Sequence, residues 1–504
     1  MKIQPFLEHH GIARNPFAEE DAQTDPVFKE HCIDSTYHPT WDKVYGDPNE
    51  PASSIVFGEK GSGKTAMRLQ LARHLEAFNE QSPHKRLFVV QYDDFNPFLD
   101  RFRDRLSNRN RRPDKVLQQW KLWDHMDAVL TLSVTGIVDR ILEARQPSGG
   151  VICKIEQSKV DQLDRHQARD LLVLTACYDQ ATAENFQERW HRLRRRLKFN
   201  TYQSYKQLAI GIGWMVGMIA ILATIFFTTN GESWLLPPWW VALPLVLVGW
   251  IPWLIKAWKN FWLARSILSR MRVGIRQTND LRKVFMQFTP AELASQPLPN
   301  KDSTDDRYEL LMKLQAILQT LGYPGIVVLI DRVDEPHLIN GQAELMKALI
   351  WPVLDNKFLK HPGLGLKLML PIELWRFTER EERDFYQRAR LDKQNVIPSF
   401  EWTGEALYDV ANARVKACAV DASRSPNLKS LFEPSISEAR LIESFRTLRV
   451  PRRLFKFLYK LLVSHCNAHT DENPVWQVTS SRFESELALT LRDQDAFDRG
   501  VGAG

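Results

Sequence analysis

Residues 55–67 of the chain read IVFGEKGSGKTAM, in which an apolar run meets a glycine-rich turn, a lysine and a threonine. From residue 58 onward the stretch matches the pattern G-x-x-x-x-G-K-[ST] in full. Glycine permits backbone angles that turn successive N–H groups toward phosphate oxygens. In such a loop the ammonium of Lys64 reaches the β- and γ-phosphates of a nucleotide, and the hydroxyl of Thr65 binds Mg²⁺. The stretch therefore predicts a phosphate-binding P-loop, with nucleotide contacts from Gly58, Gly61, Gly63, Lys64 and Thr65.

The residues on either side of the turn support this interpretation. SSIVF, residues 53–57, reads as a buried strand that enters the loop, and TAMRLQLARHLEAF, residues 65–78, has the apolar spacing of a helix that leaves it. The N-terminus of that helix would add its dipole to the phosphate site. An ordinary glycine loop is the weaker alternative, because strand, loop and helix all agree with the motif.

A nucleotide site of this type needs a second strand whose terminal aspartate helps to hold Mg²⁺. The best candidate is GIVVLIDRVDEP, residues 325–336, which opens with a short apolar run typical of a central strand. Asp331 falls at the carboxyl edge of this strand, where ligands bind in open α/β sheets. Asp334 or Glu335 would then act as general base on the attacking water. A buried strand that ends in a solvated acidic loop is the alternative.

Two uncharged segments fill much of the gap between these motifs. They run from Gln207 to Asn230 and from Trp234 to Ile255, and NGES separates them. Each is long enough to cross a hydrocarbon core as a helix, so the pair predicts a transmembrane hairpin. Four prolines predict a kinked second segment, and the tryptophans at its ends fit an interfacial belt. Two buried core helices are the alternative.

The charges that flank the hairpin predict its orientation. Seven Lys or Arg and no acid occupy residues 189–206, and six with no acid occupy residues 256–276, whereas Glu232 is the only charge in the turn. By the positive-inside rule both flanks are cytoplasmic. The expected location is therefore the inner (cytoplasmic) membrane, with a multi-pass chain whose termini and nucleotide-binding core lie in the cytoplasm. Nucleic-acid binding by the basic segment RLRRRLKF is less favoured, since its juxtamembrane position already accounts for the charge.

The bulk composition is that of an ordinary globular chain. It has 504 residues, is 44% hydrophobic and 25% charged, and carries a formal net charge of +6. Its five cysteines are scattered and lack CxxC spacing, which excludes a disulfide framework and favours a reducing compartment. Residues 1–17 contain no apolar h-region, so no cleaved signal peptide is expected.

The expected fold class is α/β: a P-loop NTPase of the ASCE type with a mostly parallel sheet, a helical insertion that contains the transmembrane hairpin, and a C-terminal helical lid. FRTLRVPRRLFKFLYKLLVSHC, residues 445–466, predicts a lid helix with Pro451 in its first turn. The expected segments are an N-terminal lead-in (1–50), the first half of the core (51–100), the helical insertion (101–206), the hairpin (207–257), a juxtamembrane helix and linker (258–304), the second half of the core (305–402), the lid (403–470) and a C-terminal tail (471–504).

These motifs together resemble a known family. The P-loop, the membrane hairpin inserted before the acidic strand, and a cytoplasmic core resemble the KAP group of membrane-associated P-loop NTPases. VVLIDRVDE also resembles the acidic strand of the signalling STAND NTPases, and TLRVPRRLFKFL resembles the sensor-2 region in the lid of Orc-like AAA+ ATPases. The resemblance implies ATP and Mg²⁺ as cofactors, Mg²⁺ held by Thr65 and Asp331, and nucleotide contacts from Arg452 or Arg453.

The chain departs from these families at two points. Arg332 follows Asp331, where AAA+ proteins usually have glutamate. The strand LKLMLPIEL offers no standard polar sensor at its end, and Glu373 is the nearest candidate. An arginine finger at Arg388 or Arg390 would rest on position alone.

The expected function is a membrane-anchored cytoplasmic ATPase that acts as a nucleotide-dependent molecular switch. Lys64 and either Asp334 or Glu335 would form its catalytic set. The family resemblance implies roles in phage defence or signalling, self-association, and a protein partner or trigger. The alternatives are an ATP-gated effector that permeabilises or remodels the bilayer, and a nucleotide-binding scaffold without turnover.

Overall fold

The computed structural model describes residues 1–145, 147, 149–182, 184–228, 238–354, 357–381, 385, 391, 395–421 and 426–498. Its strands form a six-stranded sheet in the order β3-β2-β4-β5-β1-β6. The chain divides into two compact units. One comprises Met1–Ser82 and Val327–Gly504, and the other comprises Pro83–Ile326.

The sheet is mixed but mostly parallel, which confirms the α/β class. β1 (Ser54–Gly58) pairs in parallel with β5 (Leu364–Pro371) and with β6 (Asn395–Ile397). β4 (Gly325–Ile330) is buried along its whole length, as are β1 and β5. Continuous apolar runs of this kind are typical of parallel strands that are covered on both faces. The antiparallel pair is β2 (Leu87–Tyr92) with the two-residue strand β3 (Val151–Ile152).

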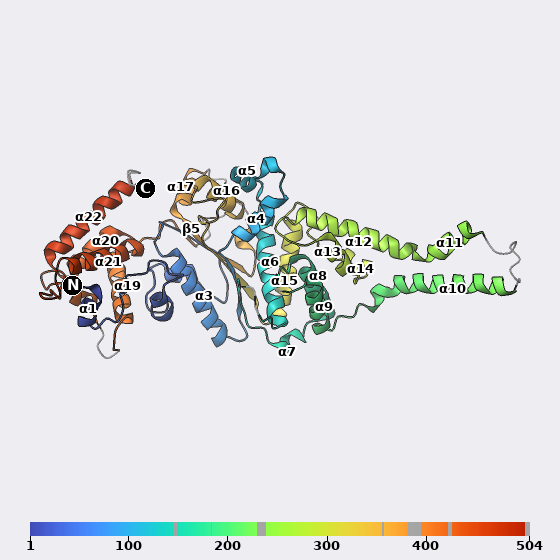
Figure 1. Ribbon diagram of the computed structural model, residues 1–504, viewed down its shortest axis with the longest axis horizontal. Coiled ribbons are helices and arrows are strands. Elements are labelled where there is room, and N and C mark those ends of the chain that lie inside the picture. The colour runs from blue at the N-terminus through green and yellow to red at the C-terminus, as the bar shows by residue number, and fades with distance from the viewer. Residues whose placement is uncertain are drawn as a thin grey trace. The chain divides into compact units, whose positions relative to one another are not determined.

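The first unit joins both ends of the chain in one hydrophobic core. Phe6 and Leu7 of the N-terminal helix α1 are fully buried in the same cluster as Leu454, Leu458 and Leu461 of α21. Figure 1 shows the blue α1 beside the red α21. The helices of this unit are α1 (Ile3–His9), α2 (Trp41–Tyr45), α3 (Lys64–Gln81), α16 (Ala343–Leu354), α17 (Ile372–Arg380), α19 (Gly404–Ala417), α20 (Glu438–Leu448), α21 (Pro451–Asn467) and α22 (Ser480–Asp498).

The second unit is mainly helical and includes the hairpin (Figure 1). Its central helix α6 is buried on nearly every face, including the carboxylates of Asp124, Asp127 and Asp139. The helices of this unit are α4 (Asn96–Arg105), α5 (Pro113–Gln119), α6 (Leu122–Ile141), α7 (Gln157–Val160), α8 (Arg165–Tyr178), α9 (Phe186–Arg196), α10 (Lys206–Thr228), α11 (Trp239–Leu247), α12 (Ile251–Arg270), α13 (Thr278–Phe285), α14 (Pro290–Ala294) and α15 (Asp305–Thr320).

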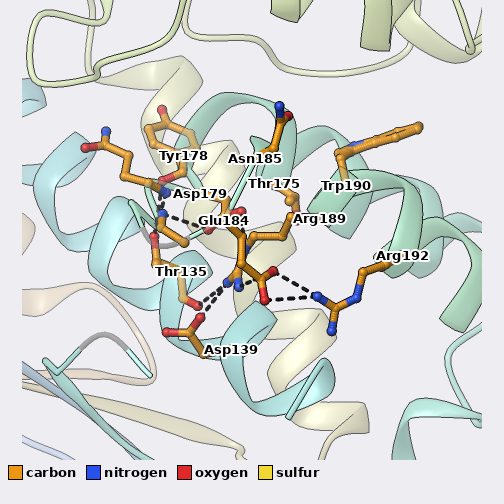
Figure 2. Close-up of polar contacts among 12 residues, drawn as sticks. Thr135, Asp139, Thr175, Tyr178, Asp179, Glu184, Asn185, Arg189, Trp190 and Arg192 are labelled. Atoms are coloured by element: carbon orange, nitrogen blue, oxygen red, sulfur yellow. Dashed lines mark hydrogen bonds and ion pairs between the residues drawn. The ribbon is translucent and has the colours of Figure 1, made fainter. Parts of the chain in front are cut away.

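Buried carboxylates of this unit are paired with arginines, as burial of a charge requires. Arg189 of α9 is 2% exposed and donates to Asp139 at 2.6 Å and to Asp179 at 2.8 Å (Figure 2). Arg307 donates to Asp127 at 3.2 Å, and both side chains are fully buried. These pairs tie α6 to α9 and α15.

Part of the basic flank that precedes the hairpin is therefore used inside the fold. Besides Arg189, Arg192 lies 2.9 Å from Glu184. Arg196 and Lys198 lie 3.1 Å and 3.2 Å from Asp161. Arg189 is buried, whereas the ion pairs of Arg192, Arg196 and Lys198 lie at or near the surface of the second unit.

Two helices in the described part of the chain are long and apolar enough to cross a membrane. They span Tyr202–Phe227 and Trp240–Arg270, and their apolar side chains lie mostly on the surface. The predicted turn, with Glu232 and Trp234, lies outside the described residues.

The two legs of the hairpin pack where Trp214 of one leg meets Leu245 and Gly249 of the other. The Trp214 indole donates to the Leu245 carbonyl at 2.9 Å. A Cβ atom at Gly249 would lie 2.5 Å from the Cβ of Trp214, so only glycine fits there. Helix α11 contains Pro244 and gives way to a 3₁₀ turn, Val248–Trp250, before α12 begins. Proline removes a backbone donor and crowds the preceding turn, which accounts for the predicted irregularity of the second leg.

Other local predictions had mixed outcomes. The strand before the glycine-rich loop, the acidic strand and the strand at LKLMLPIEL all form, and α21 begins at Pro451. The segment 258–304, predicted as a juxtamembrane helix and linker, also contains the short helix α14, whose Thr289 accepts from the backbone N–H of Glu292. The sequence did not predict β3, because two residues carry no pattern.

Candidate functional site

The glycine-rich loop joins β1 to α3 with the backbone that the motif requires. Gly61 and Gly63 have φ angles of +86° and +95°, a region that favours glycine. Lys64 is the first residue of α3, and its ammonium donates to the carbonyls of Gly58 at 2.8 Å and Glu59 at 2.9 Å. The lysine therefore folds back over its own loop.

Several charges act on the Lys64 ammonium. Burial lowers its pKa, and the carboxylates of Asp331, Asp334 and Glu373 oppose that effect, whereas Arg452 adds to it. Carboxylates from the loop after β4 and from α17 thus lie near the lysine of the glycine-rich loop.

Asp331 follows β4 and is 2% exposed. Burial raises the pKa of its carboxyl, while Arg68 and a hydrogen bond from the Thr65 hydroxyl oppose that rise. The Nε atom of Arg68 lies 3.3 Å from the Asp331 Oδ2 atom. That oxygen has no hydrogen-bond partner among the described residues. The Thr65 hydroxyl and the Asp331 carboxylate are hard oxygen ligands of the kind that Mg²⁺ prefers, so this pair fits the ion.

The acidic loop after β4 begins in a strained conformation. Arg332 has a φ angle of +61°, which is uncommon for a residue with a side chain. Its Nε atom lies 3.5 Å from the Glu335 Oε1 atom. Burial raises the pKa of Glu335, and Arg332 opposes this, while Asp334 and Asp331 add to it.

Helix α21, which the sequence predicts as part of a lid, contacts the loop directly. The backbone N–H of Arg452 donates to the Gly61 carbonyl at 3.3 Å. Its guanidinium Nε lies 3.9 Å from Glu20 of the N-terminal segment. Arg453 instead lies 3.4 Å from Glu59, a residue of the loop itself. The two predicted lid arginines therefore have different neighbours.

An aromatic cluster supports the other side of the loop. The Trp402 indole donates to the Ser62 carbonyl at 2.7 Å. The rings of His38 and Phe400 stack with centroids 3.7 Å apart. Burial lowers the pKa of His38 to about 4, although a hydrogen bond to the Glu401 carbonyl works against this. His38 is therefore neutral near pH 7.

These groups surround a cavity of about 350 Å³, a volume in the range of small-molecule sites. Eight residues predicted for the site line this cavity: Gly61, Gly63, Lys64, Thr65, Asp331, Asp334, Glu335 and Arg452. Gly58 and Arg453 act from just outside it, through Lys64 and Glu59. Part of the wall is apolar, with Phe28, Met67, Phe400, Trp402 and Phe455. The cavity is therefore lined by both charged and apolar residues.

The sequence analysis did not identify several residues that lie at or near the cavity. Arg68, which does not line the cavity but contacts Asp331, lies four positions after Lys64 in α3, a spacing that could have placed both on one helix face. Glu20, His38 and Trp402 come from segments far from the P-loop in sequence, and no motif marks them. Glu373 does line the cavity. Arg388 and Arg390 lie outside the described residues.

No protein-family model, curated protein or solved structure matches this chain, so the interpretation of the site rests on its own sequence and geometry.

Proposed function

We propose that the chain is a membrane-anchored ATPase that acts as a nucleotide-dependent switch, related to the KAP group of P-loop NTPases. The observation that carries the proposal is the convergence of Lys64, Thr65 and Asp331 on one cavity. These residues belong to two motifs far apart in sequence, each of which the sequence predicts for a nucleotide site.

Each residue has a definite task in this proposal. Lys64 would exchange its bonds to the Gly58 and Glu59 carbonyls for bonds to phosphate oxygens. Thr65 and Asp331 would hold Mg²⁺, which neutralises phosphate charge when bound. Arg452 would contact the nucleotide from the lid, so that binding draws the lid and the loop together.

Hydrolysis requires a base that takes a proton from the attacking water, as the bond between the γ-phosphorus and its bridging oxygen breaks to leave ADP and phosphate. Asp334 and Glu335 both line the cavity. Asp334 is among the main charges that act on Lys64, whereas Glu335 is 55% exposed on its side chain and faces Arg332. This placement favours Asp334 as the base over Glu335.

The membrane part of the proposal rests on the hairpin. Its two apolar helices expose their side chains, as a lipid-facing surface would. In the proposal the hairpin fixes the switch at the cytoplasmic face of the inner membrane, where self-association or a protein trigger would control it.

The turnover experiment uses the full chain purified in detergent. Release of phosphate from Mg-ATP is measured for the wild type and for Lys64→Ala, Asp334→Asn and Glu335→Gln. Lys85→Ala, an exposed lysine, is the matched control. We expect turnover in the wild type and the control, loss of at least about a hundredfold in Lys64→Ala, and a greater loss in Asp334→Asn than in Glu335→Gln. Mg-ATP binding without turnover in the wild type would instead identify a nucleotide-binding scaffold.

The membrane experiment extracts cell membranes with alkaline carbonate. We expect the full chain to stay in the pellet, as integral proteins do. A variant in which a short polar linker replaces residues 208–254 should move to the supernatant. Release of the full chain would refute membrane insertion.

A further inference from the structure

A buried lysine joins the two legs of the hairpin at their base. The Lys256 ammonium donates to the Ser204 carbonyl at 3.0 Å and to the Met286 carbonyl at 2.9 Å, and Lys256 is 5% exposed. Ser204 lies just before α10 and Lys256 lies in α12, so the bond between them joins the legs just outside their uncharged segments. Figure 1 shows α10 and α12 alongside each other. Residues within about one turn of either partner therefore lie at the same level of the hairpin.

Aromatic side chains at and next to this level are exposed. On the first leg Tyr202 is 81% exposed and Tyr205 is about half exposed. On the second leg Trp258 is 64% exposed, and Trp262, one turn further along α12, is about half exposed. Tyrosine and tryptophan gather at the headgroup level of membrane proteins, because each combines an apolar ring with a polar atom. These four rings have the exposure and the position of such an interfacial belt.

Two exposed lysines stand beside these rings. Lys206 follows Tyr205, and Lys259 follows Trp258. Neither lysine has an ion pair within the part of the chain that the structure describes, whereas Arg189 and Arg196 of the same basic flank are paired with aspartates. Both ammonium groups are therefore available to an anion outside the protein.

A lipid surface matches this combination of groups better than a nucleic acid does. Both partners offer phosphates to lysine. A nucleic acid would leave the exposed rings and the adjoining apolar helices uncovered, whereas a phospholipid has its phosphate directly above the hydrocarbon that those helices require. The choline cation of phosphatidylcholine balances its phosphate, but phosphatidylglycerol keeps a net negative charge. The two lysines should therefore prefer the anionic lipid.

We propose that the base of the hairpin carries a collar that binds the headgroups of anionic phospholipids. The collar consists of Tyr202, Tyr205, Lys206, Trp258, Lys259 and Trp262. Lys206 and Lys259 bind the lipid phosphates, and the four rings lie in the headgroup layer. This inference rests on the proposed insertion of the hairpin, and it adds that the charge of the membrane surface sets how tightly the chain is held.

The second leg of the collar is attached to the helices of its own unit at two points. Lys256 binds it near the membrane end, through the carbonyls of Ser204 and Met286. Arg105 of α4 donates to the carbonyls of Leu268 and Met271 at 2.6 Å each, at the other end of α12. Trp258, Lys259 and Trp262 lie between these attachments or next to them, so the fold holds them in place before any lipid binds.

The test captures the full chain from detergent micelles that contain equal amounts of phosphatidylglycerol and phosphatidylcholine. The phospholipids that stay bound are then quantified. We expect the wild type to retain phosphatidylglycerol over phosphatidylcholine by at least about threefold, and the variant Lys206→Gln/Lys259→Gln to bring this ratio close to one. Lys85→Gln, at an exposed lysine outside the hairpin, is the matched control and should keep the ratio of the wild type. Trp258→Ala/Trp262→Ala should retain less of both lipids.

Three results would overturn the proposal. One is equal retention of the two lipids by the wild type, and another is an unchanged ratio in Lys206→Gln/Lys259→Gln. The third is displacement of the bound phosphatidylglycerol by a short DNA duplex at the same phosphate concentration, which would assign the lysines to nucleic acid. Unchanged retention in the tryptophan variant would likewise refute the part of the rings. A wild type that stays in the carbonate pellet but retains both lipids equally would refute the collar alone, whereas release by carbonate would refute insertion itself.

Discussion

The backbone N–H of Arg452 donates to the carbonyl of Gly61 at 3.3 Å, so the first turn of helix α21 contacts the glycine-rich loop. A Cβ atom at Gly61 would lie 2.6 Å from the Cβ of Arg452, closer than such atoms approach in proteins. The glycine is thus needed twice, for its backbone angle and for this contact.

Gly61→Ala should therefore destabilise the first unit more than a backbone effect alone would. The positive φ angle costs roughly 1 kcal/mol, and the crowded contact adds about 1–3 kcal/mol. Gly11→Ala is the control, because Gly11 has a φ angle of +73° and no atom within 4 Å of the added methyl group. Denaturant unfolding of both variants measures the difference. Equal losses would show that the lid moves aside without cost.

Arg189 should be essential to the second unit, whereas its neighbour Arg192 should not. Arg189→Met leaves the carboxylates of Asp139 and Asp179 buried without their cation. We expect this to lower the free energy of unfolding by about 3–5 kcal/mol, as loss of one partner of a buried ion pair typically does. Arg192 is 43% exposed, so loss of its ion pair with Glu184 should cost less than about 1 kcal/mol. The two denaturation midpoints, measured under the same conditions, test this contrast. Similar midpoints would mean that the buried network contributes little.

His38 should make the first unit sensitive to acid. Burial lowers its folded-state pKa to about 4, below the ordinary value of 6.5. The folded state therefore disfavours the proton, and the contribution of His38 to stability is fully present above pH 6.5 and lost as the pH falls toward 4. The change amounts to about 3 kcal/mol.

Unfolding free energies between pH 7 and pH 4 test this for the wild type and His38→Gln. The variant will be less stable at pH 7, but its stability should fall less steeply with acid. His84→Gln, at an exposed histidine, should keep the slope of the wild type. A slope that His38→Gln does not change would assign the acid sensitivity to other groups.

Gly249→Leu should disrupt the packing of the hairpin. A Cβ atom at position 249 would overlap Trp214, whereas a Cβ atom at position 217 would meet no atom within 4 Å. Overpacking of this kind costs about 1–3 kcal/mol, so the thermal midpoint in detergent should fall for Gly249→Leu and stay nearly constant for Gly217→Leu. Equal midpoints would mean that the legs do not pack as described.

The sequence predicted those parts of the fold and site that depend on neighbouring residues. Lys64 and Thr65 belong to one local motif, and the buried run before Asp331 marks a strand by composition alone. The hairpin was equally visible, because length and lack of charge identify it. In each case the physical signal lies within a short stretch of the chain.

The remaining features depend on contacts between distant segments. The Trp402 indole donates to the carbonyl of Ser62, which lies 340 residues away in sequence, and no local pattern predicts that hydrogen bond. The basic residues before the hairpin are compatible with two roles, contact with a membrane surface and ion pairing inside the fold. Their charge indicated the membrane, and only the structure shows that Arg189 is buried between two aspartates. A sequence pattern shows which residue types are present, whereas an ion pair depends on where in the fold the partner residue lies.

Arg105 of α4 donates to the carbonyls of Leu268 and Met271, so α4 is bound to the C-terminal end of α12. Helix α12 continues without a break from Ile251 to Arg270, a rod of 20 residues that is about 30 Å long. At one end of this helix, Arg105 donates hydrogen bonds to backbone carbonyls. The other end of the helix belongs to the apolar hairpin. A tilt of only about 5° at the held end would move the far end by roughly 2.5 Å over that length. The helix is thus a lever, and small adjustments of α4 would be enlarged at the far end of the apolar leg.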